Sequence, residues 1–163
     1  MSYQSFEQVL QKCHTEEKEF WRVILEDDMA ERNVSEEDSM EHMRATWDAM
    51  LLAAATYEGN LSSSSGLVGG DGRRMEEYIR SAQPQSLCGE YVDTCIAGAL
   101  QMGESNACMK RIVAAPTAGA CGVLPAVLVP YFQKRCKDTD KILKAMYVAA
   151  GIGQIIATRS SIS

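Results

Sequence analysis

Aromatic residues are scarce in this 163-residue chain, at 7% of the total, and it has only two histidines and four prolines. A β-sandwich depends on aromatic and β-branched cross-strand pairs, so this shortage argues against that class. Alanine, glycine, methionine and leucine recur instead, which suits closely packed helices. With 46% hydrophobic residues, a chain of this length can bury one core. The composition predicts a single all-α domain over residues 1–163, a compact bundle of about six to seven helices.

Positive charge is also in short supply, because 16 Lys and Arg face 22 Asp and Glu for a net charge of -6. A phosphate backbone would be repelled by this balance, so nucleic acid is not an expected partner. A basic segment followed by an apolar signal region is absent from the N-terminus. The apolar run at 122–131 is too short and too interrupted by proline to cross a bilayer. We therefore expect a cytoplasmic protein with no membrane partner.

The cysteines lack the short C-x-x-C spacing of many metal and redox sites. Cys108 and Cys121 are thirteen residues apart, so no complete metal-ligand set is predicted within the chain. Cys121 lies at the start of a predicted helix, where a thiol could act as a nucleophile. A nucleophile also needs a base, and neither His14 nor His42 is tied to it by spacing. A buried structural thiol is the favoured interpretation.

Hydrophobic periodicity predicts helices along most of the chain. Two short helices are expected first, over residues 2–11 and then from Thr15, which would cap the second. Ser35, followed by three acids, predicts the start of a long helix ending near residue 57. The buried stripe of this long helix is predicted to be Met40, Met43, Trp47, Met50, Leu51 and Ala54.

Later segments are predicted to be helical as well. A short helix should end before Pro84, and another should span residues 89–102. A proline-containing helix should run through Cys136, and a final helix over 138–157 is apolar on most sides, which predicts that it is buried. Residues 112–115 could form a strand on pattern alone, but a lone strand has no ladder to join.

Two Ser/Thr/Gly-rich loops could carry chemistry. The first, Ser62–Asp71, has four consecutive hydroxyls before Gly66, and such turns can form a nest of donors for a carboxylate or phosphate. It lacks the Lys-Ser/Thr of a P-loop and the preceding strand of a dinucleotide-binding motif. A flexible connection between helices is an equally good interpretation.

The second loop, 115–122, precedes a helix whose free N–H groups could hold an anion. The alternative is a tight connection in which Gly119 and Gly122 let backbones approach. Asn106 and Arg111 precede this loop and could bind a substrate carboxylate or amine, or else act as a helix cap and a surface ion-pair partner.

Two blocks of sequence together carry a family resemblance. They read Ser63-x-Ser65-Gly66-Leu67-x-Gly69-Gly70-Asp71 and Asn106-Ala107…Arg111-Ile112-Val113-Ala114-Ala115-Pro116-Thr117-Ala118-Gly119-Ala120-Cys121-Gly122…Pro125-Ala126. The chain resembles, over nearly its whole length, the alpha chains of iron–sulfur-dependent L-serine dehydratases, also called L-serine ammonia-lyases. It departs from the family pattern at Lys110, where glycine is usual.

The resemblance implies β-elimination of water from L-serine to give pyruvate and ammonia. In that family an open iron of a 4Fe-4S cluster acts as the Lewis acid, and pyridoxal phosphate is not used. It also implies a beta chain or beta domain as partner, in a homo- or hetero-oligomer. Because the family's cluster cysteines lie beyond the point matching Ser163, we expect this segment to be inactive alone and to hold no metal.

The substrate-binding residues implied by the resemblance come from both loops and the segment between them. They are Ser63, Ser65, Gly66, Asn106, Thr117, Ala118 and Gly119. The general base is not identified by the sequence. Two other classes remain open: a binding module for a small carboxylate without chemistry, and a helical interaction domain.

Overall fold

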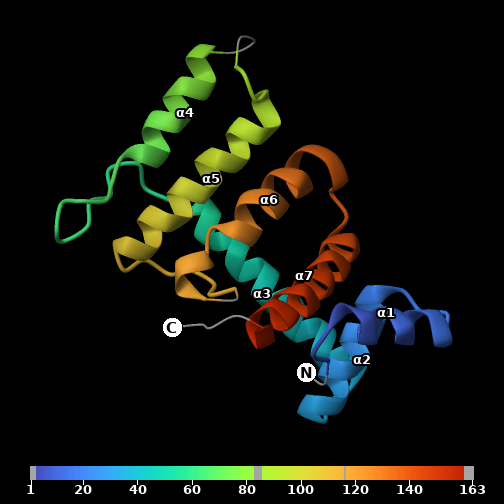
Figure 1. Cartoon of the computed structure of the whole chain (residues 1–163). Coiled ribbons are helices and arrows are strands. Elements are labelled where there is room, and N and C mark those ends of the chain that lie inside the picture. The colour runs from blue at the N-terminus through green and yellow to red at the C-terminus, as the bar shows by residue number, and fades with distance from the viewer. Residues whose placement is uncertain (1–2, 83–85, 116, 160–163) are drawn as a thin grey trace. The chain divides into compact units, whose positions relative to one another are not determined.

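The computed structural model describes residues 3–82, 86–115 and 117–159 (Figure 1). Within these ranges the regular elements are helices, which confirms the predicted all-α class. They are α1 (Phe6–Thr15), α2 (Phe20–Arg32), α3 (Glu36–Ala55), α4 (Asp71–Ala82), α5 (Glu90–Ala107), the 3-10 turn η1 (Ala118–Ala120), α6 (Val123–Tyr131), the π-turn η2 (Phe132–Cys136) and α7 (Thr139–Arg159). The strand considered for residues 112–115 does not form.

The chain divides into two compact units. One comprises Met1–Ala45 with Asp138–Ser163, and the other comprises Thr46–Lys137. The single domain expected over 1–163 stays a prediction. In the described part of the chain, no helix combines the length and the apolar character required to cross a membrane.

The first unit is built on the packing of α2 against α7. Its core consists of buried side chains from three helices: Val9, Val23, Ile24, Leu25, Tyr147 and Ile155. A Cβ atom at Gly151 would lie 2.6 Å from Ile24 Cδ1, so the absence of a side chain at this position lets α7 approach α2. The Ser39 hydroxyl lies 2.7 Å from the Tyr147 hydroxyl and donates to Asp28 at 2.6 Å, which satisfies the polar groups inside this core.

The predicted cap at Thr15 is wrong. Thr15 is the last residue of α1, and its hydroxyl donates to the Gln11 carbonyl at 2.9 Å. A Thr side chain that bonds back one turn continues its own helix instead of opening the next. α2 begins at Phe20 after Glu19, which makes no side-chain cap.

The predicted start of α3 is confirmed by a reciprocal cap. The Asp38 N–H donates to the Ser35 hydroxyl at 3.1 Å, and the Ser35 N–H donates to the Asp38 carboxylate at 3.2 Å. Of the predicted stripe on α3, Trp47 and Met50 are buried. The other four residues, Met40, Met43, Leu51 and Ala54, are half-buried.

The prediction that the last helix is buried on most sides is wrong for one face of α7. Ile142 and Leu143 are buried, but Ile156 is 56% exposed and Ile152 is 37% exposed. A helix buries only the sides that another element covers, and in its own unit α7 packs against α2.

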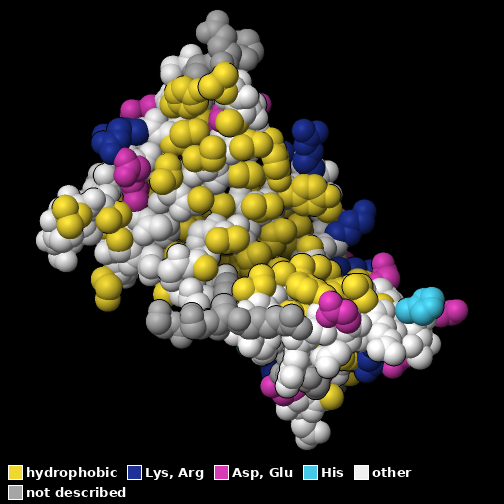
Figure 2. All heavy atoms as spheres, in the orientation of Figure 1, with side chains coloured by type: hydrophobic (Ala, Val, Ile, Leu, Met, Phe, Trp, Pro, Cys, Tyr) yellow, Lys and Arg dark blue, Asp and Glu magenta, His cyan; other side chains and the backbone are white. Residues whose placement is uncertain are grey.

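The second unit is organised around α5, which packs against α4 on one side and α6 on the other. α5 and α6 approach closely at Gly122, where a Cβ atom would lie 3.0 Å from the Ala99 carbonyl oxygen. Apolar side chains on α5 and α6 remain exposed and cover one face of this pair (Figure 2). They are Val92, Ile96, Leu100, Val123, Val127 and Tyr131, and we call this set the α5–α6 apolar face.

Candidate substrate site at the end of α5

The C-terminal turn of α5 is the part of the second unit to which both predicted loops are attached. α5 continues five residues beyond the predicted end at Met102 and ends at Ala107. The added turn carries Glu104 and Asn106, whose side chains bond to different loops. This turn therefore sets where both loops lie.

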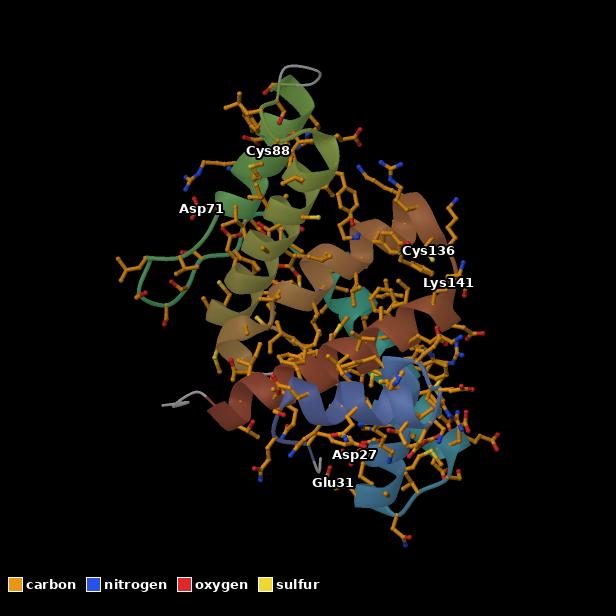
Figure 3. The ribbon with its side chains drawn as sticks, turned by 45° about the vertical axis from the view of Figure 1, so that its right-hand side comes forward. Asp27, Glu31, Asp71, Cys88, Cys136 and Lys141 are labelled. Carbon is orange, nitrogen blue, oxygen red and sulfur yellow. The ribbon has the colours of Figure 1, made fainter. Side chains whose placement is uncertain are left out.

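Glu104 is a buried carboxylate, only 2% exposed, that receives hydrogen bonds from two other elements. Its Oε1 accepts from the backbone N–H groups of Asp71 and Gly72, at 3.1 Å from Gly72. Its Oε2 accepts from the Tyr57 hydroxyl at 2.6 Å. Asp71 lies where the first loop enters α4 (Figure 3), so Glu104 fastens the end of that loop.

The electrostatics of this contact are favourable. The first N–H groups of a helix have no partner within it, and the macrodipole makes that end positive. The Glu104 carboxylate therefore fills the anion position at the start of α4. Burial, together with the adjacent Glu104 carboxylate, raises the pKa of Tyr57 well above its ordinary value, so Tyr57 remains a proton donor.

Gly72 leaves the space that this contact requires. A Cβ atom there would lie 2.8 Å from the Tyr57 hydroxyl oxygen and 2.7 Å from Gln101 Cγ. Any side chain would push α4 away from Tyr57 and α5. Glycine at this position therefore lets the start of α4 lie close to both.

The serine-rich loop closes on itself between Ser63 and Val68. The Ser63 N–H donates to the Val68 carbonyl at 2.8 Å, and the Val68 N–H donates to the Ser63 hydroxyl oxygen at 3.1 Å. Gly66, with a positive φ of 72°, donates its N–H to the Ser63 carbonyl. The backbone nest expected here is thus largely used by the loop, and the hydroxyl groups are what remain for a ligand.

Ser63 and Ser65 form a pair, with their hydroxyl oxygens 3.2 Å apart. Each oxygen accepts a backbone N–H, from Val68 and Leu67 respectively. The pair has two hydroxyl protons and uses one between its members, so the second can be donated to a ligand.

The second loop is attached to α5 through Asn106, whose Nδ2 donates to the Ala118 carbonyl at 3.2 Å. The structure thus brings together Asn106 and Ala118 of the predicted site, as it does Ser63 and Ser65. Thr117 precedes the three-residue turn η1, and its exposed hydroxyl makes no capping bond to that turn. Gly119 and Arg111 are exposed, and Pro116 lies outside the described residues.

Cys121 is a buried thiol, as favoured from the sequence. It is 2% exposed, and its Sγ lies 3.7 Å from the Met102 carbonyl oxygen. Burial raises the pKa of this thiol, which is the opposite of what a nucleophile requires.

The sequence patterns do not single out Glu104 or Tyr57 as candidate functional residues. The hydrophobic pattern predicts that the helix ends at Met102, which leaves Glu104 outside it, and predicts only a helix end near Tyr57. A signal was present, because Glu104 is an isolated acid two residues before Asn106 in an otherwise apolar and small-residue stretch. Its partners come from distant residues, which periodicity does not reveal.

The described residues do not fit an iron–sulfur cluster. Among them, no three His, Cys, Asp or Glu side chains gather closely enough to hold a metal ion. Cys88 and Cys136 illustrate this, since they lie on separate segments in Figure 3, beside α5 and in η2. A cluster needs several thiolates around one point, and these residues do not supply them.

Comparison with known proteins supports the family resemblance that the sequences of the two loops carry. The family model for the serine dehydratase alpha chain matches residues 15–163, so the chain belongs to the serine dehydratase alpha chain family. The L-serine dehydratase alpha chain of Peptoniphilus asaccharolyticus is 30% identical over 153 residues, covering 91% of this chain and 51% of that protein. The probable L-serine dehydratase alpha chain of Bacillus subtilis is 30% identical over 141 residues, covering 86% of this chain and 46% of that one.

A shorter stretch of the chain matches another relative at higher identity. L-serine dehydratase 2 of Escherichia coli is 43% identical over 67 residues, covering 40% of this chain and 14% of that protein. The chain spans about half the length of the alpha chains that it matches. No solved structure matches it.

Proposed function

We propose that this chain is the substrate-holding segment of an L-serine dehydratase, a lyase that removes water from L-serine to give pyruvate and ammonia. The observation that carries the proposal is that both loops resembling the family's signatures are fastened to one turn of α5, through Glu104 and Asn106. Membership in the alpha chain family supports the substrate class.

In this proposal the hydroxyl groups of the two loops bind the substrate. The spare proton of the Ser63 and Ser65 pair and the exposed Thr117 hydroxyl donate to the carboxylate of L-serine. A hydrogen bond to a charged group contributes about 1.5–3 kcal/mol. In the same proposal, Gly66, Ala118 and Gly119 lie beside the substrate, and Asn106 holds the second loop through its bond to the Ala118 carbonyl.

The 4Fe-4S cluster implied by the resemblance belongs to the intact enzyme in this proposal. Because the described residues do not fit a cluster, we assign to this chain only the binding and orientation of L-serine. A beta chain or beta domain is the partner that the alpha-chain family suggests. We expect binding without turnover by the chain alone.

Isothermal titration calorimetry with L-serine tests this function. The wild-type chain should bind saturably. The double variant Ser63→Ala with Ser65→Ala, and separately Thr117→Val, should each weaken binding about tenfold or more, since each removes a hydrogen bond to the charged carboxylate. Ser81→Ala is the matched control, because the Ser81 hydroxyl donates to the Tyr78 carbonyl on α4 and belongs to neither loop. Absence of saturable binding, or equal affinities in wild type and both loop variants, would contradict the proposal.

A further inference from the structure

We propose that Glu104 is a positioning residue for the serine-rich loop: it occupies the anion position at the start of α4 and so directs the substrate carboxylate to the loop hydroxyls. The substrate part of this statement rests on the proposed function. The structural part, that Glu104 holds the loop in place, stands on the contacts of Glu104 alone.

Two features of the position of Glu104 within α5 would by themselves disfavour a carboxylate there. It lies in the last turn of α5, where the negative end of that helix dipole disfavours a carboxylate. It is also buried, and an unpaired buried charge is costly. The donors from Asp71, Gly72 and Tyr57 offset both costs. The contact therefore joins three segments: the end of the loop, the segment that follows α3, and α5.

The same contact removes one place where a substrate could bind. A helix N-terminus is normally available to a carboxylate, but at α4 the protein's own carboxylate already accepts the N–H groups of Asp71 and Gly72. In the proposed function, the donors assigned to the L-serine carboxylate are therefore the side-chain hydroxyls of Ser63, Ser65 and Thr117. Glu104 acts through the loop and does not touch the substrate.

Amide hydrogen exchange of the segment 58–74 tests the structural part. We expect Glu104→Ala to accelerate exchange at Asp71 and Gly72 about tenfold or more, because both N–H groups lose a charged acceptor. Glu104→Gln keeps an acceptor oxygen and should give a smaller increase. Glu77→Gln is the matched control, since Glu77 is an exposed acid on α4 that pairs with Arg73 on the same helix at 3.6 Å.

Chemical rescue separates positioning from a general loss of structure. Sodium formate added to Glu104→Ala can place a small carboxylate on the vacated N–H groups, so it should slow exchange at Asp71 and Gly72 back toward the wild-type rate. Sodium chloride at the same ionic strength should not. If Glu104→Ala fails to fold, Tyr57→Phe keeps the carboxylate and its two backbone donors and removes a single bond. It should accelerate exchange in the same segment to a smaller degree.

Calorimetry with L-serine tests the substrate part. Glu104→Ala should weaken L-serine binding about tenfold or more, and formate should restore it. Unchanged exchange in Glu104→Ala and in Tyr57→Phe would overturn the structural part. Faster exchange with unchanged L-serine affinity would overturn the role in substrate binding. If the wild-type chain binds no L-serine, the proposed function fails while the exchange result still decides whether Glu104 holds the loop.

Discussion

Of the described tyrosines whose pKa is raised by their surroundings, Tyr57 and Tyr147 lie beside other polar groups. Tyr147 is 1% exposed beside Ser39, and burial raises its pKa above the ordinary value. Tyr57 is raised by burial and by Glu104. Each hydroxyl therefore stays protonated at a pH where an ordinary tyrosine ionises, next to other polar groups in a core or at the candidate site.

These shifts predict a loss of stability at high pH. Above about pH 10, tyrosines in the unfolded chain release protons that the folded chain still holds, so the free energy of unfolding falls as pH rises. Each such proton contributes up to about 1.4 kcal/mol per pH unit. Tyr147→Phe should flatten this decline in urea unfolding between about pH 9.5 and 11, with no matching change in slope near pH 7. An identical decline in wild type and variant would contradict it.

At the scale of the helices, glycine allows two of them to pack closely. Two glycines of α7, Gly151 and Gly153, can be compared directly. Gly151 faces α2, where an added Cβ would lie 2.6 Å from Ile24 Cδ1 and 3.0 Å from Phe20 Cε1. Gly153 is one helical half-turn away on the same helix, with no atom within 4 Å of an added Cβ. The two positions share a helix and differ in what a side chain would meet.

Alanine at these two positions should change stability in opposite directions. Gly153→Ala should stabilise the protein by up to about 1 kcal/mol, because alanine favours the helix. Gly151→Ala gains the same propensity but crowds a buried isoleucine, and overpacking costs about 1–3 kcal/mol. Urea unfolding measures the free energy of unfolding of both variants. An equal change in both would show that Ile24 can move aside without destabilising the protein, and would contradict the prediction.

At the scale of the whole molecule, the α5–α6 apolar face is the most evident surface feature of the second unit (Figure 2). Val123 is 60% exposed and Val127 is 51% exposed, and with Val92, Ile96 and Leu100 they recur at helical spacing along two packed helices. Contiguous apolar surface of this kind binds apolar probes and promotes association.

Polar substitution on this face should therefore change solution behaviour without changing the fold. Ile96→Ser combined with Val127→Ser should lower the fluorescence of the dye ANS and raise the solubility limit of the protein, while far-ultraviolet circular dichroism stays the same. Leu67→Ser is the control, because Leu67 is 87% exposed on the loop and is not part of the face. Equal ANS fluorescence in the double variant and wild type would count against this view of the surface.

The sequence by itself determined the class and most of the helices. The spacing of apolar residues, the Ser35 cap and the Ser- and Gly-rich stretch after Tyr57 are local signals, and local signals fix where a helix starts or stops. The two signature blocks likewise identified the family before any contact was known. A local signal can still mislead, because threonine occurs both as the N-cap of a helix and in the last turn of a helix. Thr15 is predicted to be a cap, but it is the last residue of α1.

The tertiary structure alone decided how the candidate site is held. The Glu104 contact joins Tyr57, Asp71 and Gly72 to α5. These residues are too far from Glu104 in the sequence for a helical repeat to relate them. The tertiary structure also decided that α5 extends to Ala107, that Cys121 is buried, and that one face of α7 is exposed. Burial and hydrogen bonding depend on which distant segments meet, and that is a property of the folded chain.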